Sequence, residues 1–304
     1  MKEVKNSTNV IDNNSIINAF KNEFATTVNV IYINSLKTEL KFREVSVTEQ
    51  KSLSKLMIEN EDRRDIIYDA QCALINNLCL DDVVVKTTNT ESGEEVTTTE
   101  KFDIYNLTEF DRIRILMEIY QTNYIKNDIT YTCKECGMQN TYKIDFTRVV
   151  ELLNNFDLTD KVYTLEDQYR IYNFTMNYPS VRQVSNFYKN YNKKYKNTSK
   201  QEKEVLENLS NIEYINLFIK QIEMINKKDK SNRQVADLSI MSFNQIEQLI
   251  SYFPQTILFD DNTGVIKYIT TEFIEAINNT FNYEKCASCG AINYAGVGSV
   301  SDFF

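Results

Sequence analysis

Two short stretches decide the fold of this chain: CKECGMQN at Cys133–Asn140 and CASCGAIN at Cys286–Asn293. Both fit the pattern C-x-x-C-G-x-x-N, so the same motif occurs twice. The glycine after the second cysteine permits a positive φ angle, which lets a tight turn aim two thiolates at one metal ion. Two such turns supply four sulfur ligands, the set typical of a structural zinc site.

We predict that Cys133, Cys136, Cys286 and Cys289 bind one zinc ion with a structural role. Four thiolates fill the tetrahedral coordination of zinc and leave no open position for chemistry. Two alternatives stay open: each pair could be an idle reduced turn, or a C-x-x-C redox pair. The repeated motif favours zinc, although the stretch between the pairs is far longer than in a usual zinc ribbon.

The composition argues against several classes of function. Hydrophobic residues make up 42% and charged residues 25% of the chain, and the net charge is -9, which disfavours nucleic acid as the main partner. Histidine is absent, which removes imidazole bases and histidine metal ligands. The chain shows no phosphate loop, dinucleotide-binding glycine turn or nucleophile elbow. We therefore expect a protein that is not an enzyme and has no small-molecule substrate.

The distribution of apolar residues bears on location. No apolar run approaches the roughly 20 residues that span a bilayer, so we expect no membrane span. The first residues, Met1 to Asn9, are polar and lack the apolar centre of a signal peptide. We therefore expect the protein in the cytoplasm, where thiols stay reduced.

The spacing of apolar residues predicts an α+β fold that is mainly helical, with small antiparallel sheets and a zinc-ribbon-like pair of knuckles that together carry four cysteines. Scattered acidic residues on the helices are expected to face solvent. We divide the chain into four regions: an N-terminal α+β region at 1–128, the first zinc knuckle and strands at 129–178, a helical region inserted between the knuckles at 179–282, and the second zinc knuckle and C-terminal tail at 283–304.

Individual elements follow from the same patterns. Helices are predicted at 11–23, from Thr48, at 62–79, from a Thr108/Asp111 cap, at 148–156, 181–191 and 203–226, from a Ser242 cap to a point before Pro254, and at 271–281. Strands are predicted at 28–33, 40–45 and 169–176, and on both sides of the first cysteine pair. The Thr/Glu-rich stretch 86–101 is either an exposed hairpin or a loop. Cys72 and Cys79 lie on a helical apolar seam and are expected in the core.

Two segments leave a choice open. Tyr188–Lys196 interleaves aromatic and basic residues, as single-strand binders do, but the acidic chain favours a solvated helix end and linker. Phe303 and Phe304 either fold back onto their own domain or insert into a partner, because a phenyl ring is costly to leave in water.

Several segments, in this order, resemble those of a known family: FREVSVTEQKSL (Phe42–Leu53), DIIYDAQCALINNLC (Asp65–Cys79), NLTEFDRIRILMEI (Asn106–Ile119), ITYTCKECGMQNTYKIDF (Ile129–Phe146), NYPS (Asn177–Ser180) and SDFF (Ser301–Phe304). Together they resemble the baseplate proteins of T-even-like, contractile-tailed phages, a family involved in assembling the baseplate hub. The resemblance implies a non-enzymatic structural or assembly protein of the phage tail. Its partners would be other tail and baseplate proteins, met in the host cytoplasm during virion assembly.

Two other functions remain as alternatives. The first is a zinc-ribbon adaptor that acts on nucleic acid or on the transcription machinery, against which the net charge speaks. The second is an enzyme of an unrecognised type, against which the missing histidine and motifs speak. The sequence leaves open whether the protein stays in the finished virion, which partner it contacts and in how many copies.

Overall fold

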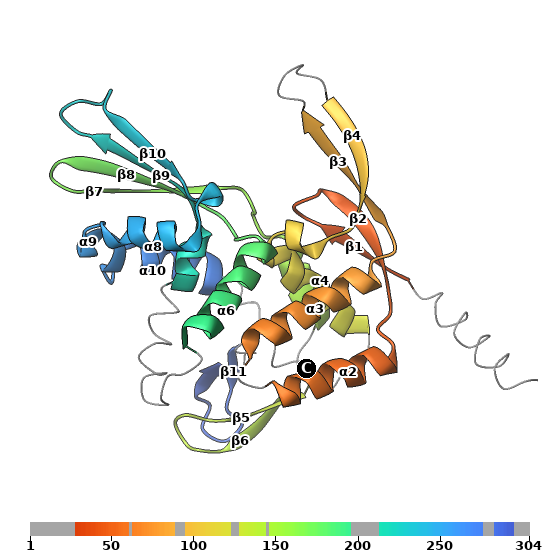
Figure 1. The fold of residues 1–304 in the computed structure, drawn as a ribbon. Coiled ribbons are helices and arrows are strands. Elements are labelled where there is room, and N and C mark those ends of the chain that lie inside the picture. The colour runs from red at the N-terminus through yellow and green to blue at the C-terminus, as the bar shows by residue number, and fades with distance from the viewer. Residues whose placement is uncertain are drawn as a thin grey trace, which may run out of the picture.

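The computed structural model describes residues 28–60, 63–88, 95–122, 128–143, 146–195, 213–275 and 283–294. Helices and small antiparallel sheets share these ranges, which confirms the predicted α+β class (Figure 1). None of the helices described is long and apolar enough to cross a membrane. The helix predicted at 11–23 and the two final phenylalanines lie outside the described residues.

The first part of the chain, up to residue 122, alternates hairpins and helices. Its elements are β1 (Val28–Ile33), β2 (Thr38–Arg43), α2 (Val47–Glu59), α3 (Arg64–Leu78), β3 (Asp82–Thr88), β4 (Glu95–Lys101) and α4 (Glu109–Thr122). β1 and β2 pair antiparallel, as do β3 and β4. The stretch 86–101 therefore contributes to a hairpin, one of the two predicted alternatives, with residues 89–94 outside the description.

Two of the helices in this part, α2 and α4, begin at side-chain caps. Ser46 Oγ accepts from the Glu49 backbone N–H at 3.2 Å, and the Glu49 carboxylate accepts from the Ser46 N–H at 3.0 Å, which is a capping box. At α4, Thr108 Oγ1 accepts from the Asp111 N–H at 3.2 Å, as predicted. The Asp111 carboxylate instead accepts from the Asn34 backbone N–H at 2.9 Å, which ties α4 to the β1–β2 turn.

Acidic residues of α4 depart from the expected solvated face. Asp111 is fully buried, and Glu109 is 5% exposed. Glu109 accepts from Arg112 at 2.6 Å, so the buried charge is paired. The Arg112 guanidinium also lies over the ring of Tyr68, at 4.2 Å from its centroid. The Glu109 charge is thus paired with Arg112, whereas the buried Asp111 carboxylate accepts hydrogen bonds from the protein.

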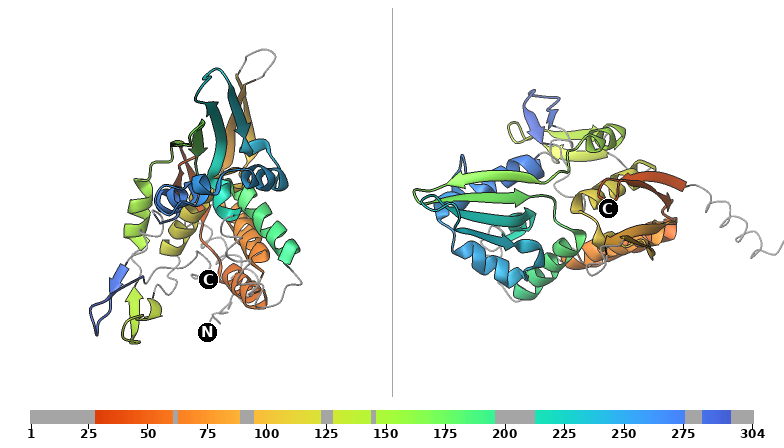
Figure 2. Two further views of the ribbon diagram at one scale, coloured as in Figure 1. Left: turned by 90° about the vertical axis from the view of Figure 1, so that its left-hand side faces the viewer. Right: turned by 90° about the horizontal axis from the view of Figure 1, so that it is seen from above.

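The largest sheet has the antiparallel order β10-β9-β8-β7. Its strands are β7 (Lys161–Glu166), β8 (Arg170–Met176), β9 (Ile219–Asn226) and β10 (Arg233–Asp237). Alternate residues of β8 are buried, namely Tyr172, Phe174 and Met176, as expected for a strand with one face in the core. Helices cover this face (Figures 1 and 2), and the Phe253 ring lies 5.8 Å from that of Phe174.

The helix predicted at 203–226 is wrong from Ile219 onward, because residues 219–226 form strand β9. Ile219 and Ile222 are spaced as on a helical face, but a β-bulge explains the same spacing. The register shifts beside Met176, so Ile219 lies opposite Met176 and Ile222 lies opposite Phe174. One extra residue in the strand thus lets two residues three apart share a face. The region 179–282 therefore contains a β-hairpin as well as helices.

The helices of the second half complete the core. They are α5 (Phe146–Asn154), α6 (Val181–Tyr195), α8 (Phe243–Ser251), α9 (Gln255–Phe259), α10 (Val265–Ile269) and a π-helix (Thr270–Glu275). The π-helix replaces the start of the helix predicted at 271–281, of which residues 276–281 lie outside the description. Buried apolar side chains from both halves of the chain form one cluster.

Two predictions about single side chains concern this core. Cys72 is fully buried, and burial raises the pKa of its thiol to about 12. Cys79 is half-buried at the end of α3, and burial raises its thiol pKa to about 11.

α6 extends the predicted helix to Tyr195, so most of the aromatic and basic segment is a helix end. There Lys189 Nζ pairs with Asp69 at 2.7 Å.

Candidate metal centre

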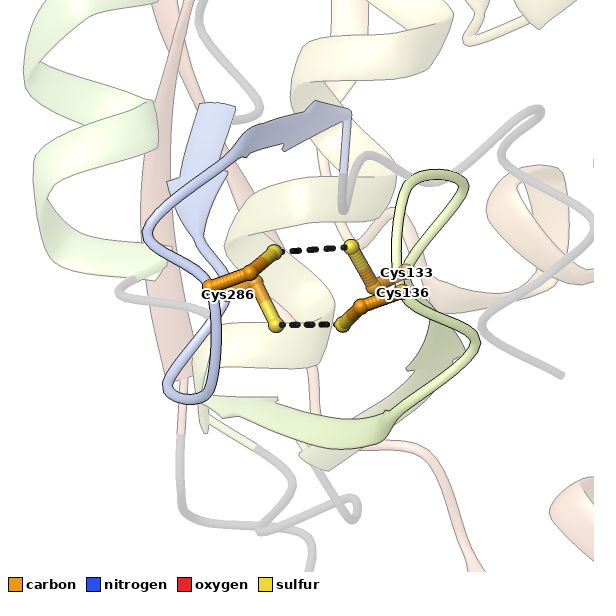
Figure 3. Close-up of side chains that lie close together, drawn as sticks. Cys133, Cys136 and Cys286 are labelled. Carbon is orange, nitrogen blue, oxygen red and sulfur yellow. Dashed lines mark hydrogen bonds between the residues drawn. The ribbon is translucent and has the colours of Figure 1, made fainter.

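The two cysteine motifs form the turns of two small hairpins. The first hairpin joins β5 (Asp128–Thr132) to β6 (Gln139–Lys143), and the second joins β11 (Tyr283–Lys285) to β12 (Ile292–Tyr294). Both lie at the end of the molecule opposite the strands β3–β4 and β9–β10 (Figures 1 and 2). Figure 3 shows the turns facing each other, with their sulfur atoms between them.

The sulfur atoms have the spacing of a metal site. Cys133 Sγ lies 3.7 Å from Cys289 Sγ, and Cys136 Sγ lies 3.6 Å from Cys286 Sγ. All four lie within 4.8 Å of one another. Zinc–sulfur bonds of about 2.3 Å in a tetrahedron place sulfurs about 3.8 Å apart, whereas a disulfide would bring them to about 2.05 Å. All four predicted ligands are thus brought together in a cluster that could hold one metal ion.

Both turns share one backbone design. In the first, the Cys133 N–H donates to Met138 O at 2.8 Å, and the Gly137 N–H donates to Cys133 O at 2.9 Å. The second turn repeats both bonds at matching positions, each at 2.9 Å. Gly137 and Gly290 both have φ of +71°, and a Cβ atom at either would meet nothing within 4 Å. Backbone conformation, not lack of space, therefore requires glycine at these positions.

The asparagine that ends each motif contacts the opposite turn. Asn293 Nδ2 donates to Cys133 Sγ at 3.3 Å, and its Oδ1 accepts from the Lys134 N–H at 3.0 Å. Asn140 repeats this geometry, with Nδ2 3.5 Å from Cys286 Sγ and Oδ1 3.0 Å from the backbone nitrogen that follows Cys286. Sequence reasoning assigned no role to these side chains. Their repetition at the eighth position of the motif was the available signal.

Burial and charge divide the ligands into two kinds. Cys133 and Cys286 are each 2% exposed, whereas Cys136 and Cys289 are exposed. The backbone N–H of Cys136 lowers the pKa of Cys133, and that of Cys289 lowers the pKa of Cys286 to about 6. The Ala291 N–H acts to lower the pKa of Cys289, but the neighbouring sulfurs outweigh it and raise that pKa to about 12. Several cysteine sulfurs close together are difficult to ionise at the same time, because their negative charges repel. A bound cation would remove this repulsion, so the cluster suits a metal ion.

Within the described ranges, no other group of three or more cysteine, aspartate or glutamate side chains is placed to share an ion. The arrangement is chemically closed, because four sulfurs already supply the usual coordination number of zinc. A metal ion held by these four sulfurs would join two distant segments of the chain. In comparisons with known proteins, no family model, no curated protein and no solved structure matched this chain.

Proposed function

We propose that the protein is a non-enzymatic structural or assembly protein whose fold depends on one zinc ion bound by Cys133, Cys136, Cys286 and Cys289. The observation that carries this proposal is the closed set of four sulfurs, supplied by two segments that lie 150 residues apart at Cys136 and Cys286. Thiolate ligands without histidine or carboxylate favour zinc over harder ions.

The energetic role of this zinc follows from the length of chain that it closes. A cross-link across 150 residues removes loop entropy from the unfolded chain worth about 5 kcal/mol. Structural zinc sites contribute on the order of 10 kcal/mol in all. Net stabilities of folded domains are about 5–15 kcal/mol, so a contribution of this size decides whether the chain folds.

The setting that we propose is the baseplate of a contractile phage tail. The ordered resemblance of the segments quoted above supports it, and the absence of histidine and the four-sulfur cluster agree with a role that is not enzymatic. In this setting the protein contacts other tail and baseplate proteins in the host cytoplasm during assembly. Its zinc keeps the two knuckles joined while these contacts form.

Metal content tests the zinc assignment. The purified chain should contain one zinc ion, and a strong chelator should lower its melting temperature and increase its protease sensitivity. Cys286→Ser should abolish stoichiometric zinc. Cys79→Ser is the matched control, because that thiol is half-buried and is not part of the cluster. The assignment would be refuted if the purified chain contained no metal and its melting temperature were the same with and without the chelator.

A second experiment tests the setting. Tagged protein expressed during infection should recover tail or baseplate proteins, and mass spectrometry of purified virions tells whether it remains in them. Recovery of transcription or replication proteins instead, with none from the tail, would favour an adaptor role. Cys286→Ser serves as a control for contacts that depend on the folded knuckles.

A further inference from the structure

We propose that Asn140 and Asn293 are positioning residues that set the zinc affinity of the site, each by donating a hydrogen bond to a thiolate of the opposite turn. The inference rests on the proposed zinc site and assigns to it two residues that are not ligands. Each asparagine acts on the turn that it does not belong to, so each turn supplies a hydrogen-bond donor to a cysteine sulfur of the other turn.

The donors reach the two ligands that water cannot reach. Cys133 and Cys286 are each 2% exposed, so their negative charge depends on hydrogen bonds from the protein. Asn293 Nδ2 is 3.3 Å from Cys133 Sγ, and Asn140 Nδ2 is 3.5 Å from Cys286 Sγ. The exposed ligand Cys136 can be hydrated directly. The asparagines therefore supply donors where solvent supplies none.

Each amide is fixed by three contacts, which makes its direction unambiguous. In Asn293, Oδ1 accepts from the Lys134 N–H at 3.0 Å, while Nδ2 donates to Ala291 O at 2.9 Å as well as to sulfur. Asn140 repeats the internal bond, with Nδ2 donating to Met138 O at 2.9 Å. A backbone N–H must face an oxygen and a carbonyl must face an NH₂ group, so the NH₂ group points to the sulfur.

Substitutions can separate the two halves of the amide. Asn→Asp keeps an acceptor for the backbone N–H but loses the donor to sulfur and adds a negative charge. Asn→Ala loses the donor and adds no charge. Both changes share the loss of Nδ2, so a weakening common to both reports on the donor. Partners that orient metal ligands typically change metal affinity by about 10–100-fold when they are removed.

The test measures zinc affinity on the full chain by competition with a chromophoric chelator. We expect Asn293→Asp, Asn293→Ala and the same changes at Asn140 each to bind zinc about 10–100-fold more weakly. Asn155→Asp is the matched control, because Asn155 Nδ2 donates to a carbonyl, Glu151 O, at 2.9 Å on the surface. Its zinc affinity should equal that of the wild type.

Spectroscopy separates this role from a general structural one. In cobalt-substituted protein, loss of an N–H donor leaves more electron density on sulfur, so the sulfur-to-cobalt charge-transfer band should move to lower energy in the Asn293 and Asn140 variants. In wild-type protein loaded with cadmium-113, the side-chain amide protons of both asparagines should show scalar coupling to the metal. This second measurement needs no variant to fold.

The outcomes distinguish this inference from the zinc assignment. A wild-type chain that binds neither zinc nor cadmium would overturn both. Tight zinc binding by the wild type, with equal binding by the Asn140 and Asn293 variants, would overturn the inference alone. Absence of coupling to cadmium in a fully loaded wild-type protein would also overturn it.

Discussion

Replacing the turn glycines with alanine should weaken the metal site through backbone strain alone. Gly137 and Gly290 both have φ of +71°, where an L-residue is disfavoured by about 1–2 kcal/mol. A Cβ atom would meet no neighbour within 4 Å at either position, so no clash adds to this strain. Each alanine should therefore lower the unfolding free energy of the zinc-bound protein by about 1–2 kcal/mol.

The same strain should appear in zinc affinity, because a turn that relaxes when the metal leaves must be strained again when it binds. An energy of about 1–2 kcal/mol corresponds to about 5–30-fold weaker binding. Denaturant unfolding at saturating zinc and chelator competition measure the two quantities. Asparagine tolerates a positive φ angle better than alanine. Gly137→Asn should therefore reduce the unfolding free energy and the zinc affinity less than Gly137→Ala does.

Gly264→Ala provides the contrasting control. Gly264 has φ of -64°, but a Cβ atom there would lie 2.6 Å from backbone atoms of Asp260. Its alanine variant should unfold more easily through this clash, with zinc affinity unchanged. Two results would refute the strain argument. One is an unchanged unfolding free energy in Gly137→Ala, and the other is an equal loss of unfolding free energy in Gly137→Asn and Gly137→Ala.

Three further predictions concern reactivity, acid stability and the core. In the zinc-bound protein all four sulfurs are thiolates, so exposure decides their reactivity, and limited iodoacetamide followed by peptide mass mapping should label the exposed Cys136 and Cys289 before the buried pair. The hydrogen bond from Arg43 lowers the pKa of Glu49 to about 2, below its ordinary 4.5, so its stabilising effect is present above pH 4.5 and is lost as the pH falls toward 2. Urea unfolding from pH 6 to pH 2 should show a flatter acid dependence for Glu49→Gln. Phe174→Ala empties a fully buried site and should cost about 3–5 kcal/mol in denaturant unfolding.

The cysteine cluster could be predicted from the sequence because a repeated motif carries its own geometry. The glycine that follows Cys136 or Cys289 indicates the positive φ angle, and two equal turns indicate four ligands. The roles of Asn140 and Asn293 could not be predicted in the same way. Each contacts the opposite turn, so its partner is known only once the two hairpins are placed face to face.

The helices with strong caps could also be predicted, since a capping box is local in the sequence. Strand β9 could not, because one of its two neighbours, β8, lies more than 40 residues earlier, and only the neighbour β10 is close in the sequence. The bulge beside Met176 gave Ile219 and Ile222 a spacing that looks helical. A non-local pairing decided the structure there against the local pattern.

The joining of the two turns also determines where mechanical load travels. When one ion holds both cysteine pairs, tension applied outside them passes through metal–sulfur bonds and bypasses the intervening chain. The stretch between Cys136 and Cys286 spans 150 positions, and fully extended it would reach about 500 Å. A pulled molecule would keep this length folded until a metal–sulfur bond breaks. The strength of the metal–sulfur bonds would then set the force at which the core between the knuckles unfolds.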